Sequence, residues 1–240
     1  MRQIAAVLFD YGGTLTRLAV SEAELKTRCL RRVRRFLRTR GISVTEKQLR
    51  DADVKAWELS RPSETHREVD AYELILNLLE EVGVKASVGD QLVRDVARVD
   101  FMTAVPYIEL LPDTIPTLKA LRRCNIKMGV VSNNLFPQML KESIERLNLK
   151  PYLDTVVASG DVGVRKPAPE VFKRALLNLK CQAKETLFVG DTLEEDIVGA
   201  KELDMSTVWL NRSSSRGIES IVPDYEVRCL SDILPLLGIA

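Results

Sequence analysis

The hydrophobic pattern of the chain begins with an unbroken apolar run. Ile4 to Phe9 mixes β-branched, aliphatic and aromatic side chains without one polar residue, which predicts a strand buried on both faces of a parallel sheet. Asp10 follows directly, and Gly12 and Gly13 come next, so a carboxylate stands where the strand enters a close-approach loop. Open α/β sheets hold ligands at the carboxyl ends of their strands, which makes this loop a candidate site. An Asx-type turn without a ligand has the same pattern.

From Thr16 the apolar spacing becomes helical for about ninety residues. Capping-box spacing at Ser21 and Glu24, and again at Thr45 and Gln48, marks the starts of two helices. Four helices are predicted, at 21–40, 45–57, 69–81 and within 88–104. Because no convincing strand interrupts them, we expect an all-α insertion after the first strand.

From Leu111 predicted strands alternate with predicted helices. The strands are 127–131, 155–158, 186–189, 207–210 and 225–229, and the helices lie near 117–123, after Pro137, after Pro169, at 194–203 and at 231–237. This alternation predicts an α/β fold with a doubly wound, Rossmann-like parallel sheet. The expected organisation is a core of residues 1–16 and 111–240 with an all-α domain, 17–110, inserted in it.

Composition narrows the classes of function. The chain has 240 residues, 45% hydrophobic and 29% charged, which is typical of a globular protein. The formal net charge is +1, from 35 basic and 34 acidic residues, so no overall field favours nucleic acid or a membrane. The four cysteines are widely separated, which indicates reduced thiols. The apolar run before Asp10 is too short for a signal peptide or a membrane span, so a cytoplasmic location is expected.

The first predicted helix is densely basic. Within thirteen residues it carries seven arginines: Arg28, Arg31, Arg32, Arg34, Arg35, Arg38 and Arg40. Such a face could recruit an anionic substrate or RNA. No aromatic stacking platform accompanies it and the net charge is near zero, so a solvated face balanced by acidic neighbours is the favoured interpretation.

Polar groups stand at the ends of four predicted strands. They are Asp10, Ser132 with Asn133, Lys166, and Asp191 with Glu195 and Asp196. In a doubly wound sheet these loops open on one edge. Asp10 and Asp191 would repel each other there without a cation, and hard oxygen ligands suit Mg²⁺. Since Lys166 adds positive charge and the Ser132 segment adds donors, the site suits phosphoryl transfer, with Asp10 as the nucleophile.

Four segments in this order, DYGGTLT, VVSNN, RKPAPE and VGDTLEEDIVGA, resemble the motifs of the haloacid dehalogenase-like (HAD) hydrolase superfamily. The resemblance covers nearly the whole chain, and the all-α insertion resembles the helical cap of that superfamily. It implies a Mg²⁺-dependent hydrolase in which Asp10 is both nucleophile and metal ligand. The main-chain carbonyl of Gly12 and the carboxylate of Asp191 are the further ligands that it implies.

The same resemblance assigns roles to the remaining polar groups. Ser132 and Asn133 would bind the transferred phosphoryl group, and Lys166 would stabilise its charge. Asp196 would orient the metal's shell through water or through Lys166, whereas Glu195 is expected at the surface.

One position departs from the pattern of the superfamily's phosphatases. They usually carry a second Asp two residues after the nucleophile, where this chain has Gly12. That Asp protonates the leaving oxygen and then activates water, and its loss costs about 10²- to 10⁴-fold in rate for a poor leaving group. The expected activity is hydrolysis of a small phosphorylated metabolite. Either the substrate has a good leaving group, or the cap or the substrate itself supplies the acid.

Three alternatives stay open. C–halogen hydrolysis needs no such acid, but it needs no metal either, and the retained Asp191 argues against it. Phosphonate C–P hydrolysis through a Schiff base would use a lysine of the cap, for which the candidates are Lys26, Lys47, Lys55 and Lys85. A non-enzymatic binding protein would use the arginine-rich helix, although retention of Asp10, Lys166 and Asp191 argues against drift of the site.

Further expectations concern the surroundings of the site. His66, the single histidine, lies in a polar inter-helix stretch and is expected to be exposed. Tyr11 is expected near the site, packed on the cap or in contact with substrate. Because closure of the cap would exclude water, a hinge is expected near residues 16–20 and 107–112.

Overall fold

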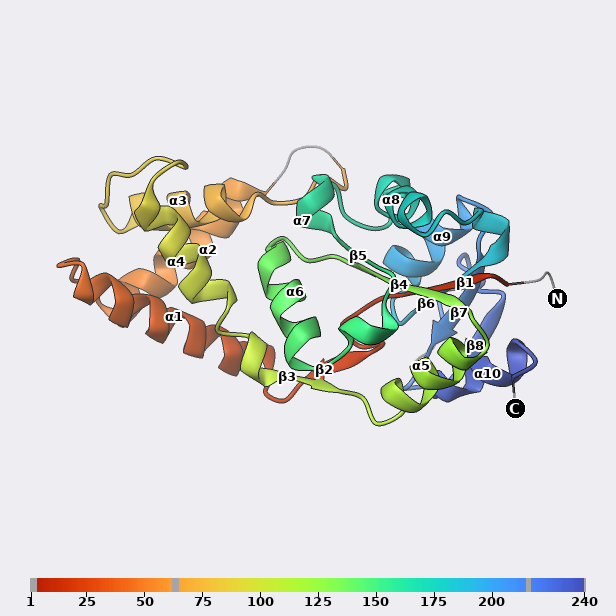
Figure 1. Ribbon diagram of the computed structural model, residues 1–240. Helices are drawn as coiled ribbons and strands as arrows, with labels where there is room; N and C mark the ends of the chain where they lie inside the picture. Colours follow the sequence, from red (N-terminus) through yellow and green to blue (C-terminus); the bar gives the residue numbers. More distant parts are fainter. Residues whose placement is uncertain (1–3, 62–64, 215–216, 240) are drawn as a thin grey trace.

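The fold is centred on a six-stranded parallel sheet (Figure 1), in a computed structural model that describes residues 4–61, 65–214 and 217–239. The strand order is β5-β4-β1-β6-β7-β8. The strands are β1 (Ala6–Phe9), β4 (Lys127–Ser132), β5 (Thr155–Ala158), β6 (Thr186–Gly190), β7 (Ser206–Leu210) and β8 (Tyr225–Val227). The predicted doubly wound sheet is confirmed, with β1 paired to β4 on one side and to β6 on the other.

Alternate residues of β1 pack on opposite faces of the sheet. Ala6 and Leu8 belong to an apolar cluster with α8 (Pro169–Leu179) and α9 (Val198–Lys201). Val7 and Phe9 belong to the cluster on the other face, and the helices of that face are α5 (Thr114–Arg123), α6 (Pro137–Arg146) and α10 (Ile233–Leu236). All four side chains are fully buried. Helices on both faces explain why this strand has no polar residue.

Four helices form a separate bundle at one end of the molecule, away from the two chain ends (Figure 1). They are α1 (Glu22–Thr39), α2 (Glu46–Ser60), α3 (Ala71–Glu81) and α4 (Gln91–Phe101). We call these four helices the helical bundle; they pack around an apolar cluster of their own. Thr45 and Gln48 form the expected capping box. Helix α3 begins two residues later than predicted because Asp70 accepts hydrogen bonds from two main-chain amides of its first turn.

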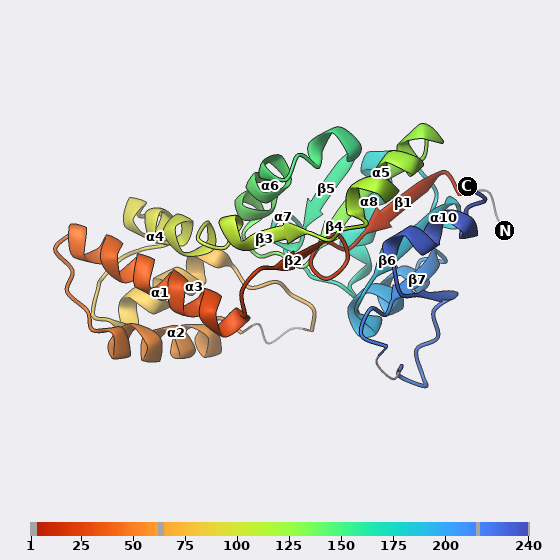
Figure 2. The same cartoon turned by 90° about the horizontal axis from the view of Figure 1, so that it is seen from below.

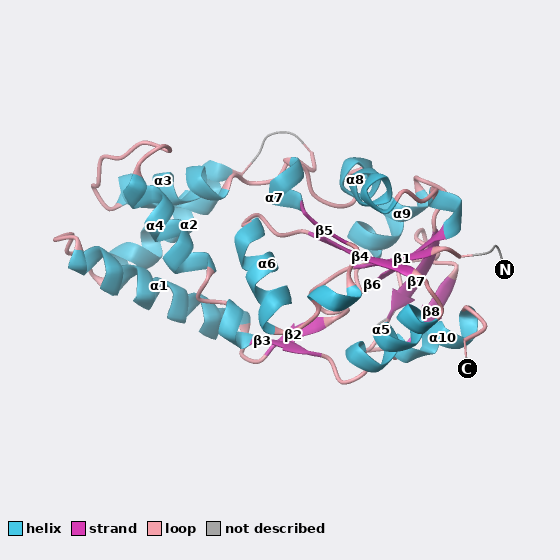
Figure 3. Ribbon diagram, viewed as in Figure 1, coloured by secondary structure: helices cyan, strands magenta, loops and turns pink. Residues whose placement is uncertain are grey.

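The expectation that no strand occurs in the insertion was wrong. Strands β2 (Thr16–Leu18) and β3 (Ile108–Leu110) form an antiparallel ribbon that joins the helical bundle to the large sheet (Figures 2 and 3). Three-residue strands are too short to show a period of two, and the partner of β2 lies beyond four helices in sequence. The ribbon lies where a hinge was expected, and movement about it remains a prediction.

Several short elements also differ from the predictions. Helix α7 (Ser159–Val162) lies in a segment expected to be a loop, and the helix expected from 194 begins as a π-helical turn, Leu193–Ile197. Short 3₁₀ turns are Val105–Tyr107, Lys150–Tyr152, Ala183–Glu185 and Leu230–Asp232. Among the described residues, no helix combines the length and apolar character that a membrane crossing requires.

Candidate active site

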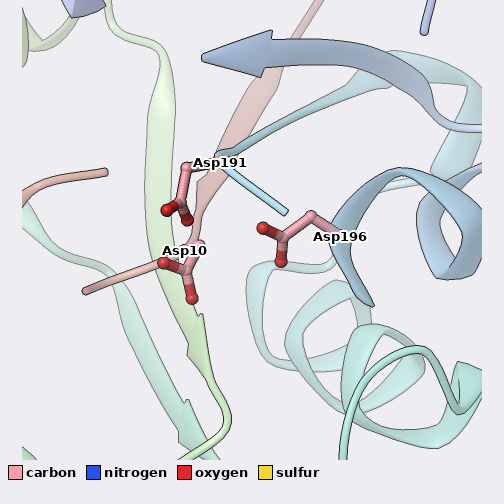
Figure 4. A group of neighbouring side chains, drawn as sticks. All are labelled: Asp10, Asp191 and Asp196. Carbon is pink, nitrogen blue, oxygen red and sulfur yellow. The ribbon is translucent and has the colours of Figure 1, made fainter. Parts of the chain in front are cut away.

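Three carboxylates meet at the carboxyl edge of the sheet (Figure 4). Asp10 directly follows β1, Asp191 directly follows β6, and Asp196 lies in the π-helical turn after β6. Each offers an oxygen that lies within 4.8 Å of an oxygen of the other two. We call this group the carboxylate cluster. The sheet brings it together because β1 and β6 are neighbouring parallel strands.

Lys166 lies against the carboxylate cluster with its side chain only 1% exposed. Its Nζ donates hydrogen bonds to Oδ1 of Asp10 and to Oδ1 of Asp196, each at 2.6 Å. The expected link between Asp196 and Lys166 is therefore a direct hydrogen bond. The ammonium bridges two carboxylates and leaves Asp191 without such a partner in the cluster.

Burial and mutual repulsion shift the protonation of the cluster. Burial raises the pKa of Asp10 to about 7, with Asp196 adding to the rise and Lys166 opposing it. Burial and then Asp196 raise the pKa of Asp191 to about 6. Burial alone would lower the pKa of Lys166, but the two carboxylates raise it above its ordinary value, so Lys166 stays protonated. Three carboxylates beside one ammonium fit a divalent cation with hard oxygen ligands, which would lower the pKa of both acids.

Two glycines allow the carboxylates this close approach. A Cβ on Gly13 would lie 2.2 Å from Oδ2 of Asp191, and the φ of Gly13 is +85°. A Cβ on Gly190 would lie 2.3 Å from Oδ2 of Asp196. By contrast, a Cβ on Gly12 would meet nothing within 4 Å. Position 12, which departs from the pattern of the superfamily that the motifs resemble, therefore faces open space.

Ser132 and Asn133, at the end of β4, differ in their contacts. Ser132 is buried and lines a cavity beside Asp191. The Asn133 side chain accepts from the main-chain N–H of Lys166 at 2.7 Å and donates to its carbonyl oxygen at 3.2 Å. The Asn133 side-chain amide therefore holds the Lys166 main chain in place.

Glu195 was expected at the surface and lies there in part, with 35% of its side chain exposed. It is half-buried and accepts hydrogen bonds from Nδ2 of Asn133 at 2.9 Å and from Arg165 at 3.1 Å. It therefore supports the side chain that positions Lys166. No sequence signal separates it from the exposed Glu194 beside it, because the π-helical turn sets the direction of each residue.

The site cavity has a volume of about 630 Å³. It is lined by the loop after β1, the start of the helical bundle, the loop after β4 and Asp191. Tyr11 lines it only in part, since its hydroxyl donates to Oγ of Ser143 at 2.8 Å inside the core. Burial raises the pKa of Tyr11 to about 12. Tyr11 therefore lies beside the site, as expected, with its hydroxyl engaged in the core, and its contact with the cap or with substrate remains a prediction.

The segment between α2 and α3 of the helical bundle contacts the loop that carries Lys166. The main-chain N–H of Arg165 donates to the carbonyl oxygen of His66 at 2.8 Å, and Glu68 N–H donates to the Gly163 carbonyl oxygen at 2.9 Å. The His66 side chain is exposed, as expected. Only the tertiary structure shows that the backbone beside it reaches the Lys166 loop.

A second contact of the bundle with the core is aromatic. Phe136, from the loop after β4, stacks on Phe101 of α4 with ring centroids 4.8 Å apart. It also forms a T-shaped contact with Tyr72 of α3, with the ring centroids 6.2 Å apart. The core residue Phe136 thereby belongs to the apolar cluster of the bundle. Together with the backbone contacts near His66, this packing places the bundle beside the site.

The arginines of α1 lie elsewhere. Arg31, Arg34, Arg35 and Arg38 are exposed and, among the residues described, line a different cavity of about 330 Å³. Acidic or main-chain oxygens contact several of them: Glu46 near Arg31, the Val44 carbonyl oxygen at Arg34 and Asp95 at Arg40. This agrees with the favoured interpretation of a solvated face with acidic neighbours.

Comparison with known proteins establishes the family. The model of the haloacid dehalogenase-like hydrolases matches residues 4–204. The chain belongs to this family, which confirms the resemblance that its four motifs carry.

The individual relatives are named as a phosphatase and a nucleotidase. The chain is 36% identical to the glyceraldehyde 3-phosphate phosphatase of Methanopyrus kandleri over 129 residues, which are 52% of this chain and 55% of that protein. It is 35% identical to the pyrimidine 5'-nucleotidase YjjG of Escherichia coli over 128 residues, 53% of this chain and 56% of that protein. The chain thus spans little more than half the length of these curated relatives.

Solved structures resemble the chain over its whole length. A 2-haloacid dehalogenase from Pseudomonas syringae pv. Tomato has a TM-score of 0.77 at 25% identity, covering 98% of this chain and 99% of that one. A HAD phosphatase from Thermococcus onnurineus has a TM-score of 0.64 at 28% identity, covering 98% of each chain. The fold is therefore shared by enzymes of two activities.

Proposed function

We propose that the protein is a Mg²⁺-dependent phosphatase that hydrolyses a small phosphorylated metabolite through an aspartyl-phosphate on Asp10. The observation that carries this proposal is the buried carboxylate cluster bridged by Lys166 beside an accessible cavity. The names of relatives such as the glyceraldehyde 3-phosphate phosphatase support it. A buried, charge-balanced edge of this kind stabilises a transferring phosphoryl group.

The proposed organisation has a core of residues 1–16 and 111–240 and a helical cap of residues 17–110. The separate apolar cluster of the helical bundle supports this division. Residues 1–3, 215–216 and 240 of the core and 62–64 of the cap lie outside the described residues.

In the proposed reaction, Asp10 attacks phosphorus. Lys166 engages Oδ1 of Asp10, and no hydrogen bond to a described residue involves Oδ2, which is left to attack. Lys166 then offsets the charge of the phosphoryl group, while the Ser132 hydroxyl donates to one of its oxygens. Asp10, Asp191 and the Gly12 carbonyl would hold Mg²⁺, which supplies further charge neutralisation when bound. Asp196 keeps Lys166 in place.

The test is phosphate release from aryl, acyl, alkyl and sugar-1-phosphates with and without Mg²⁺. We expect Mg²⁺-dependent turnover that Asp10→Asn lowers by about 10⁴-fold or more, as expected for loss of a nucleophile. Asp51→Asn, an exposed acid of α2, is the matched control and should keep full activity. Turnover that survives in Asp10→Asn, or no turnover of any phosphate by the natural chain, would refute the proposal.

C–halogen hydrolysis is the second candidate, because the dehalogenase of Pseudomonas syringae is a close structural match. It predicts halide release from a 2-haloacid without added metal. The Schiff-base alternative has less support, since none of the four cap lysines lines the described part of the site cavity. Lys26 and Lys55 instead pair with Asp53 and Glu81.

A further inference from the structure

The proposed phosphatase lacks a proton donor at Gly12, and this inference rests on that proposed function. A poor leaving group departs as an alkoxide unless an acid protonates it. The acid must come from a group that lines the site cavity, because the leaving group projects there from the phosphoryl site. The polar side chains of the described cavity lining therefore define the candidates.

Most of these side chains are already engaged or chemically unsuited. The Tyr11 hydroxyl donates a hydrogen bond to Oγ of Ser143 within the core. The Ser21 hydroxyl accepts from the Glu24 N–H at the start of α1, and an aliphatic hydroxyl is a poor acid. A guanidinium such as that of Arg17 does not serve as a proton donor in proteins. Asp191 belongs to the carboxylate cluster.

Glu22 is the carboxyl that remains. It is the first residue of α1, it is exposed, and it lines the same cavity as Gly12. No hydrogen bond or ion pair with another described residue engages its carboxylate. Glu24, two residues on, differs in each respect: it pairs with Arg28 and does not line the described cavity.

We propose that Glu22 is the general acid and base of the reaction, supplied by the helical bundle in place of an Asp at position 12. In the first step Asp10 bonds to phosphorus, the bond to the leaving oxygen breaks, and protonated Glu22 gives that oxygen its proton. In the second step water attacks phosphorus and gives a proton to ionised Glu22, and the bond to Asp10 breaks. Both protons are accounted for, and Glu22 returns to its starting form.

The geometry around Gly12 fits this arrangement. A Cβ on Gly12 would meet nothing within 4 Å, and Gly12 and Glu22 line the same cavity, so the space beside Gly12 is open to a side chain from the start of α1. The contacts of the bundle with Phe136 and with the Lys166 loop hold α1 beside the site. The acid then comes from the bundle, so reaction on poor leaving groups requires the bundle to be docked.

The test compares an alkyl phosphate with p-nitrophenyl phosphate, whose leaving group needs no protonation. Glu22→Gln should lower kcat/KM, which reports the first step only, by about 10²-fold or more on the alkyl phosphate and change kcat/KM on the aryl phosphate little. Glu24→Gln is the matched control and should act as the natural chain on both substrates. Gly12→Asp should restore alkyl phosphate hydrolysis in the Glu22→Gln background, and circular dichroism should show equal folding of all variants.

The possible results separate this inference from the proposed function. If Glu22→Gln keeps the natural kcat/KM on the alkyl phosphate, or loses kcat/KM equally on both substrates, Glu22 is not the acid. The aspartyl-phosphate reaction then still stands, provided that Asp10→Asn is inactive. If the natural chain hydrolyses neither phosphate, the proposed function and this inference fail together.

Discussion

The carboxyl edge of the sheet and the helical bundle differ in how far their charged side chains are buried. At the edge, Lys166 and Asp196 are each 1% exposed in their side chains and Asp10 is 11% exposed. In the bundle, the pair of Lys55 and Glu81 is 61% and 28% exposed. Burying charge costs desolvation free energy that an ion pair seldom recovers in full. Buried charge at the sheet edge therefore indicates chemistry, whereas exposed charge on the bundle costs little and contributes little.

Two acids in the bundle do not follow this contrast: Asp53, which is buried but paired with Lys26, and Asp100. Asp100 of α4 is 7% exposed, and its Oδ1 has no hydrogen-bond partner among the described residues. Burial raises its pKa to about 6, with Lys26 opposing the rise and Asp53 adding to it. The bundle thus contains one poorly compensated acid, which no part of the proposed reaction uses.

Removal of the buried ammonium should have the largest effect. Lys166→Met should abolish turnover and lower the free energy of unfolding by about 3–5 kcal/mol, because two buried carboxylates lose their partner. Lys55→Met is the matched control in the bundle and should cost less than about 1 kcal/mol. Urea unfolding and phosphate release measure both quantities. Equal stability of the two variants would remove the contrast between the regions.

The second prediction uses two neighbouring glycines at the sheet edge. Gly13→Ala should lower the free energy of unfolding by about 1–3 kcal/mol, from strain at positive φ, and should displace the Asp191 carboxylate. Mg²⁺ binding, followed by calorimetry, should weaken accordingly. Gly12→Ala should bind Mg²⁺ as the natural chain does, since its Cβ meets nothing within 4 Å. Similar losses in both variants would contradict the close-approach argument.

The third prediction concerns Asp100, the buried acid of the bundle without a hydrogen-bond partner for its Oδ1 among the described residues. The Asp100 pKa rises from 3.8 to about 6 on folding, so the folded state holds a proton that the unfolded state has lost. The free energy of unfolding therefore falls as pH rises from about 4 to about 6. This rise in the pKa of Asp100 accounts for a fall of at most about 3 kcal/mol. Asp100→Asn carries no charge and should be more stable than the natural chain at pH 8, by about 2 kcal/mol.

The pH dependence separates this cause from simple packing. The stability gain of Asp100→Asn should shrink as pH is lowered from about 6 to below 4, where the natural carboxyl becomes protonated in the unfolded state as well as in the folded state. Asp51→Asn, exposed on α2, should differ from the natural chain by less than about 0.5 kcal/mol at either pH. A gain that is equal at all pH values would show that the charge of Asp100 is not its source.

Much of the fold could be predicted because its signals are local. The apolar run before Asp10, the capping box at Thr45 and the regular alternation after Leu111 each depend on residues close in sequence. The same holds for the four motifs, which placed Asp10, Ser132, Lys166 and Asp191 at strand ends before any contact was known. Parallel pairing then brings such ends to one edge, as the sheet order confirms.

The remaining features depend on contacts between distant segments. The ribbon of β2 and β3, the Phe136 contact with the bundle and the support of Asn133 by Glu195 join residues far apart in the chain. The segments that make these contacts carry no hydrophobic periodicity or helix-capping pattern that would predict them. The sequence by itself determined the class of fold and the chemistry of the strand ends, because periodicity and residue type act locally. Only the tertiary structure decided how the bundle docks, which acid lines the cavity and which charges are buried, because those properties arise from packing across the whole chain.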